Sequence, residues 1–214
     1  MAYRTANPER GFSIIELLVV IGMLLIISAI AIIHLQPTLQ QFRANAGLDQ
    51  LKVALRQARE TAISQRRTIV VKFVGNNTIQ MYQMVVTVNA APPPPVTVTE
   101  AITPFNTVVL EGTVQFLTYA TETDTPDAYV PGGLTAPNGI YTENAAGAVV
   151  IGGPTSGMQF QSDGTFTDGN GNPINCTVFI GVPNINSAAR AATVLGGTGR
   201  VRAWTNNAYG WLLQ

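Results

Sequence analysis

Two patterns of hydrophobic and polar residues divide the first third of the chain. No Asp, Glu, Lys or Arg occurs between Leu17 and Phe42. As a helix, residues 12–35 would be about 36 Å long, enough to cross a hydrocarbon core of ~30 Å. Beyond this run, Leu and Ala recur at three- and four-residue spacing, which predicts an amphipathic continuation of the helix over residues 36–67. We expect Pro37 to kink or locally open the helix.

After Arg67 the period changes to that of strands. Residues 68–74 and 78–88, separated by Gly-Asn-Asn, predict a tight hairpin. One helix followed by strands predicts an α+β fold, with the long helix packed on an antiparallel sheet, and a β-rich domain over residues 68–214. Further strands are expected at Thr107–Tyr119, Ala148–Ile151, Gly157–Gln161, Thr165–Thr167, Cys176–Gly181, Ala191–Leu195 and Arg200–Trp204.

The charge content of the chain is low and balanced. Charged residues make up 11% of the 214, with twelve basic and twelve acidic side chains. This balance gives no argument for a polyanionic partner. So sparse a charged surface is expected to face membrane or neighbouring subunits, or to meet solvent through Thr, Asn and Gly. The single cysteine, Cys176, excludes an intramolecular disulfide and is expected to be a small buried hydrophobe.

The sequence offers little for catalysis or metal binding. The one histidine, His34, lies in the apolar segment, and neither a phosphate-binding loop nor a pair of catalytic carboxylates is evident. Asp168, Asn170 and Asn172 are spaced like the start of a calcium loop, but Pro173 stands where its glycine should be, which favours an Asx turn. We therefore expect no enzyme, no cofactor and no metal.

Glu16 is the unusual residue, because a carboxylate at the start of a membrane-length apolar run costs about 2.5–3.5 kcal/mol on insertion scales. An ordinary signal anchor would leave it unexplained. Cleavage between Gly11 and Phe12 would create an amine on Phe12, and Glu16 would lie about one turn further along the helix. Pairing with the amine of an adjacent subunit would remove two isolated charges from lipid.

The residues from Gly11 to Leu17, Gly-Phe-Ser-Ile-Ile-Glu-Leu, resemble the type IV prepilin motif, and residues 1–11 resemble its basic leader peptide. The resemblance implies cleavage by prepilin peptidase after Gly11 and N-methylation of Phe12. It also implies that Glu16 is needed for entry into the filament.

Three further segments resemble the GspH/FimT group of minor pseudopilins: "LDQLKVALRQARETAISQRRTIVVKF", "GMQFQSDGTFTDG" with its Phe-x-x-x-Gly hairpin, and "AARAATVLGGTGRVRAW" with a terminal Gly-Arg-x-Arg strand. The resemblance implies a minor pseudopilin at the tip of a type II secretion pseudopilus, anchored in the inner membrane with its sheet domain in the periplasm. The implied partners are other pseudopilins or minor pilins, prepilin peptidase, the inner-membrane assembly platform and membrane lipid.

Two other functions stay open from the sequence. A minor type IV pilin could prime a pilus or bind DNA during uptake, since FimT-like proteins use a strand of the Arg200 and Arg202 type on DNA. Two arginines would give only weak, salt-sensitive binding. A monomeric membrane-anchored β-domain that binds some ligand would instead need no processing and no charge at position 16. The basic residues along 43–67 are interpreted as a solvated helix face, and the alternative is an inter-subunit charge contact or a weak nucleic-acid patch.

Overall fold

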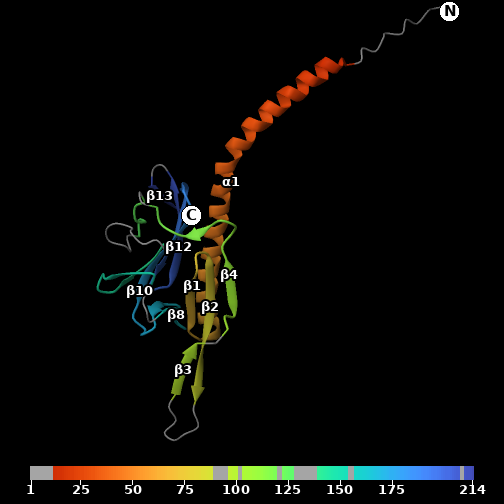
Figure 1. Ribbon diagram of the computed structural model, residues 1–214. Coiled ribbons are helices and arrows are strands. Elements are labelled where there is room, and N and C mark those ends of the chain that lie inside the picture. Colours follow the sequence, from red (N-terminus) through yellow and green to blue (C-terminus); the bar gives the residue numbers. More distant parts are fainter. Residues whose placement is uncertain are drawn as a thin grey trace, which may run out of the picture. The chain divides into compact units, whose positions relative to one another are not determined.

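The computed structural model describes residues 12–88, 96–100, 103–119, 122–127, 139–153, 157–207 and 210–214. Residues 1–11, which include Gly11 and the expected leader, lie outside the described residues. The chain divides into two compact units, residues 1–39 and residues 40–214, which are described separately. Figure 1 shows the single described helix and the strands in chain order.

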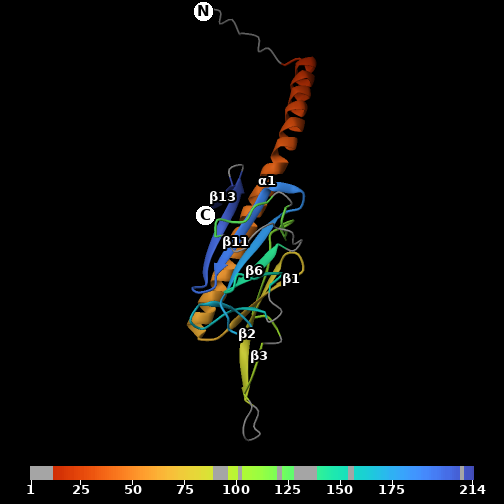
Figure 2. The same cartoon turned by 90° about the vertical axis from the view of Figure 1, so that its left-hand side faces the viewer.

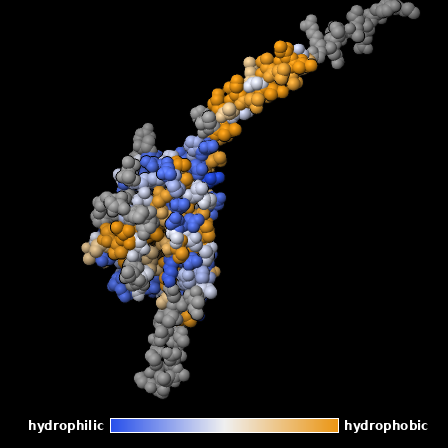
Figure 3. Space-filling view, in the orientation of Figure 1, coloured by the Kyte–Doolittle hydropathy of each residue, from blue (hydrophilic) through white to orange (hydrophobic). Residues whose placement is uncertain are grey.

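Helix α1 (Ile14–Gln65) is continuous through Pro37. The expected local opening at this proline is therefore not present, because losing one amide donor removes a single ladder bond while the turns on either side keep theirs. Within α1, one stretch is long and apolar enough to cross a membrane. Figure 3 shows that the first half of the helix has a largely hydrophobic surface.

The helix ends at Gln65, two residues before the expected end, because the backbone changes hand there. Arg66 has φ +52°. The amide of Arg67 donates to Ala62 O at 3.0 Å and that of Arg66 to Ile63 O at 3.3 Å. These two bonds form a Schellman cap, which satisfies carbonyls that the helix leaves unpaired.

The second half of α1 supplies one side of the main hydrophobic core. Leu48, Leu51 and Leu55 are at most 1% exposed, and they cluster with buried residues of both sheets. Gly47 lies so close to a loop that an added Cβ would be 2.9 Å from Val114 Cγ1. The predicted amphipathic face of the helix is thus the face that packs.

The first sheet is antiparallel, with strand order β3-β2-β1-β8-β9 and with β4 also paired to β2. The predicted hairpin is confirmed, since Val74 lies opposite Thr78 across the turn that begins at Gly75, φ +61°. The strands of this sheet are β1 (Ile69–Val74), β2 (Thr78–Val88), β3 (Val96–Glu100), β4 (Asn106–Val109), β8 (Met158–Phe160) and β9 (Phe166–Asp168).

The second sheet is also antiparallel in every described ladder, with order β13-β12-β11-β10-β6-β7 and with β5 paired to β10. Figure 2 shows β11 running beside α1. Its strands are β5 (Gln115–Phe116), β6 (Ile140–Asn144), β7 (Val149–Ile151), β10 (Ile174–Val182), β11 (Ile185–Leu195), β12 (Arg200–Asn207) and β13 (Gly210–Leu213).

The α+β class and the helix packed on antiparallel strands are confirmed, with three corrections. Two sheets stand where one was expected. The single strand expected over Thr107–Tyr119 is wrong: a turn at Gly112, φ +52°, separates β4 from β5 and thereby places them in different sheets. Strands β3, β6 and β13 were not predicted at all.

Candidate functional site

The N-terminal segment brings two of the predicted site residues together at the start of α1. Phe12 precedes the helix and is 83% exposed, and Glu16 lies exposed in its first turn. A shallow apolar hollow there is lined by Phe12, Glu16, Leu17, Val20 and Ile21.

This arrangement gives a carboxylate in apolar surroundings without a local cation. Among the described residues, Glu16 forms no ion pair. A carboxylate in the first turn gains from the helix dipole, but that gain is smaller than the cost of placing the charge in hydrocarbon. The segment is therefore chemically incomplete by itself: it offers one negative charge at the level where an amine on Phe12 would lie.

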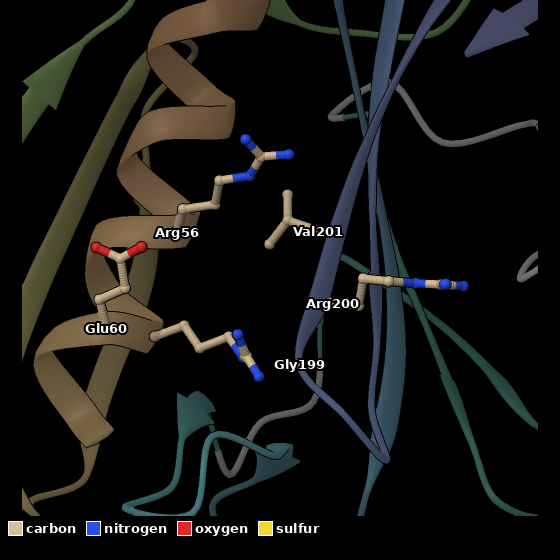
Figure 4. A pocket seen from close by; sticks show the side chains of 6 residues that line it. Arg56, Glu60, Gly199, Arg200 and Val201 are labelled. Atoms are coloured by element: carbon tan, nitrogen blue, oxygen red, sulfur yellow. The ribbon is translucent and has the colours of Figure 1, made fainter. Parts of the chain in front are cut away.

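A second candidate lies where α1 faces the turn before β12. Figure 4 shows Arg56 reaching from α1 toward this strand, while Arg200 points away from the pocket. The pocket has a volume of about 320 Å³ and is lined by Arg56, Arg59, Glu60, Gly199, Arg200 and Val201. The arginines of the helix and Arg200 are thus not gathered on one surface.

Arg59 has a structural task in this pocket. Its Nε lies 3.2 Å from Gly164 O and 3.1 Å from Thr198 O, so the side chain joins α1 to two separate turns. The turns themselves are in close contact, since a Cβ on Gly199 would be 2.0 Å from Gly164 O. Both glycines have positive φ, +86° and +59°. They are the glycines of the two motifs that resemble the GspH/FimT group, and here they hold the two turns against the helix.

The two arginines proposed for nucleic-acid contact differ sharply. Arg200 is exposed, whereas Arg202 Nη1 lies 2.6 Å from Asp127 Oδ1. The side chain of Asp127 is 8% exposed and also accepts a hydrogen bond from Thr193 Oγ1. Arg202 is thereby neutralised and fastens the loop of Asp127 to the outer face of the second sheet. This weakens the DNA alternative, because only Arg200 of the pair is available.

The remaining predicted residues have structural surroundings. Cys176 is buried, and burial raises the pKa of its thiol to about 12, which makes it an unreactive thiol. Asp168 Oδ1 accepts from the amides of Asn170 and Asn172 at 3.0 and 2.8 Å, which confirms the Asx turn. No group of three metal-ligating side chains occurs within the described residues. On α1, Arg43 and Arg56 are exposed, as a solvated face requires, and Arg66 and Arg67 are exposed just beyond its end.

Sequence reasoning missed two polar residues that the structure makes prominent. Neither Asp127 nor Arg190 was singled out, although Arg190 is only 4% exposed. The signal for Arg190 was its position as the one charged residue in the small-residue run Ser-Ala-Ala-Arg-Ala-Ala. A charge inside such a strand predicts a buried cation.

Comparison with known proteins agrees with the N-terminal interpretation. Residues 6–32 match the family model of the prokaryotic N-terminal methylation motif. No curated protein sequence matches the chain. Two solved structures of the minor pseudopilin EpsH from the type II secretion system of Vibrio cholerae are similar at 13% identity and a TM-score of 0.39. They cover 75% and 76% of this chain, and 94% of the EpsH chain in each case.

Proposed function

We propose that this type IV pilin-like protein is a minor pseudopilin of a type II secretion system. In this role it joins the tip of a periplasmic pseudopilus and supports the export of folded proteins. The observation that carries the proposal is the methylation motif together with Glu16 in the first turn of a membrane-length helix. The GspH/FimT-like glycines, which hold two turns against α1, support the minor-pseudopilin assignment over a main fibre subunit.

The proposed mechanism has two steps. Prepilin peptidase removes residues 1–11 while the helix remains a single-pass anchor in the inner membrane. Residues 40–214, which we call the sheet unit, lie in the periplasm. The new amine of Phe12 and the carboxylate of Glu16 then pair between neighbouring subunits. Two charges that are each unfavourable in lipid neutralise each other only on assembly, which makes filament entry favourable.

The test measures processing and assembly separately. Intact mass of the membrane-extracted protein should show loss of residues 1–11 and methylation of the Phe12 amine. Glu16→Ala should leave cleavage intact, since removing a charge from the apolar segment eases insertion. Cross-linking to other pseudopilins and secretion should both fall severalfold. Glu16→Gln should resemble Glu16→Ala, because an amide cannot neutralise an ammonium ion.

Glu111→Gln is the matched control for Glu16→Gln, because it removes the same charge from an exposed residue of the sheet unit. It should assemble like the unaltered protein. A full-length chain in cells with active prepilin peptidase would contradict the prepilin assignment. Normal cross-linking of both Glu16 variants would contradict the pairing mechanism while leaving processing unaffected.

A further inference from the structure

A polar pocket lies between the second half of α1 and the ends of β11 and β12, and it shares no lining residue with the pocket at Arg59. It has a volume of about 610 Å³, within the range of small-ligand sites. Its lining is Gln41, Asn186, Ser187, Arg190, Thr205, Asn206 and Asn207. Arg190 is the one charged residue among these, and it comes from β11, where it lies opposite Thr205 of β12.

Arg190 is held only by neutral oxygens. Its Nε donates to Asn45 Oδ1 of α1 at 2.7 Å, and its Nη1 donates to the carbonyls of Ser187 and Ala189 at 3.1 and 2.7 Å. Its Nη2 has no partner in the described part of the chain, and no described carboxylate lies within ion-pair distance. The nearby Thr205 Oγ1 is also buried without a partner among the described residues.

A buried guanidinium in this state is unusual. Its charge is removed from bulk water, so the group is destabilised unless an anion compensates it. Neutral acceptors use three of its five N–H donors, and the two that remain are both on Nη2. A carboxylate is a suitable acceptor for Nη2, because a hydrogen bond between two charged groups is shorter and stronger than one to a neutral oxygen. One positive charge with neutral neighbours balances a single negative charge rather than a dianion.

We infer that this pocket binds one carboxylate group, which enters from the open side and accepts hydrogen bonds from Arg190 Nη2. The carboxylate belongs to a small organic acid or to an Asp or Glu side chain of a neighbouring subunit, and the experiment below distinguishes these two sources. The site is independent of the Glu16 pairing, so it would exist even if the secretion role were wrong.

Asn45→Asp is the informative substitution, because it supplies the missing carboxylate within the chain. The new carboxylate would lie at the 2.7 Å contact that Asn45 Oδ1 already makes with Arg190 Nε. It should keep the fold and compensate the charge, and thereby weaken binding of an external carboxylate. Gln57→Glu is the matched control: it adds the same charge on the same helix, and its side-chain oxygen, which accepts from Asn106 Nδ2 at 2.9 Å, is retained.

The first measurement is thermal unfolding of the full chain in detergent, monitored by tryptophan fluorescence. Sodium acetate replaces sodium chloride at constant ionic strength. At about five times its dissociation constant, acetate should raise the midpoint by about 2–4 °C in the unaltered protein and in Gln57→Glu. In Asn45→Asp the rise should be absent, which separates binding at Arg190 from a general salt effect.

The second measurement is photo-cross-linking in cells from position 187, at the exposed mouth of the pocket, with position 64 on the exposed end of α1 as control. A cross-link to another subunit that disappears in Asn45→Asp identifies a side chain of that subunit as the carboxylate. An acetate effect without such a cross-link identifies a small organic acid. If acetate acts equally on the unaltered protein and Asn45→Asp, and no cross-link depends on Asn45, the site does not exist.

Discussion

The two halves of α1 have the same backbone and opposite surroundings. In the first half, Leu24 is 57% exposed and the apolar side chains occur on every side of the helix. In the second half, Leu51 is fully buried, while Arg56 and Glu60 occupy the opposite, exposed face. A helix that is apolar all round needs an apolar medium, whereas a helix with one apolar stripe needs a packed partner.

The comparison teaches that residue type alone does not fix the role of a side chain in this chain. Leu24 and Leu51 are chemically identical, yet only Leu51 contributes to the free energy of unfolding of the sheet unit. The same contrast recurs for arginine, in Arg200 and Arg202, and for glutamate, in Glu16 and Glu122. For leucine and arginine, the exposed member of the pair is the control for the packed one, and for Glu122 the control is the exposed Glu111 of the same unit.

The leucine pair should show the largest difference. Leu51→Ala removes buried atoms from the main core and should lower the free energy of unfolding of the sheet unit by about 2–5 kcal/mol. Leu24→Ala should change it by less than about 0.5 kcal/mol, because its side chain is exposed and is not part of the core cluster. Both free-energy changes can be measured by denaturant unfolding of the full chain in detergent, monitored by the fluorescence of Trp204 and Trp211. If both substitutions lowered the free energy of unfolding equally, the two halves of α1 would not differ in their contribution to the stability of the sheet unit.

The arginine pair should show an intermediate difference. Arg202→Gln breaks the ion pair with Asp127 and leaves a nearly buried carboxylate with only the hydroxyl of Thr193. We expect a loss of about 1–3 kcal/mol in the free energy of unfolding, the usual result of leaving a buried polar group unsatisfied. Arg200→Gln should lie within about 0.5 kcal/mol of the unaltered protein.

Asp127→Asn gives an independent check on this ion pair, because it removes the charge from the other partner. Combined with Arg202→Gln, it should cost less than the sum of the two single changes, since both remove the same interaction. Additive effects would mean that the ion pair contributes nothing. The unaltered protein, the two single variants and the double variant can also be titrated with duplex DNA. Binding that persists in Arg202→Gln would show that Arg200 alone supports it.

Much of the fold follows from the sequence wherever one period persists over many residues. The long helix, the β1–β2 hairpin and strands β8, β9, β10 and β12 lie within three residues of their predicted bounds, whereas β11 begins at Ile185, six residues before its expected start at Ala191. The split of Thr107–Tyr119 was not predicted, because a single glycine with positive φ decides it. Strand β13 has only four residues, too few for a period to show.

The candidate sites divide in the same way. Phe12 and Glu16 were predicted because their motif is local, with the site contained in a few consecutive residues. The pairing of Arg202 with Asp127 joins residues 75 apart, and that of Arg190 with Asn45 joins residues 145 apart. Such contacts depend on the order of strands in the sheet and on the register of α1 against it, neither of which a local pattern encodes.

The glutamate pair should show the smallest difference, and it appears as a dependence on pH. Glu122 Oε2 accepts a hydrogen bond from the Tyr119 amide at 3.0 Å, while its Oε1 is buried without a partner among the described residues. Burial raises the pKa of Glu122 to about 7, and the hydrogen bond from the Tyr119 amide offsets part of that rise. Its ordinary value, 4.5, applies to the unfolded chain.

Between pH 4.5 and 7 the folded protein therefore binds more protons at Glu122 than the unfolded chain does. The resulting stabilisation is complete below pH 4.5, decreases as the pH rises, and is lost above about pH 7. Since the carboxyl is only partly shielded from solvent, we expect a change of about 1 kcal/mol or less.

Glu122→Gln keeps an acceptor for the Tyr119 amide but cannot titrate, so its unfolding midpoint should fall less over this interval. Glu111→Gln, which alters an exposed carboxylate of the same unit, should retain the slope of the unaltered protein. Parallel pH profiles for Glu122→Gln and the unaltered protein would show that Glu122 is solvated like an exposed carboxylate, and the contrast with Glu16 would then be one of position only.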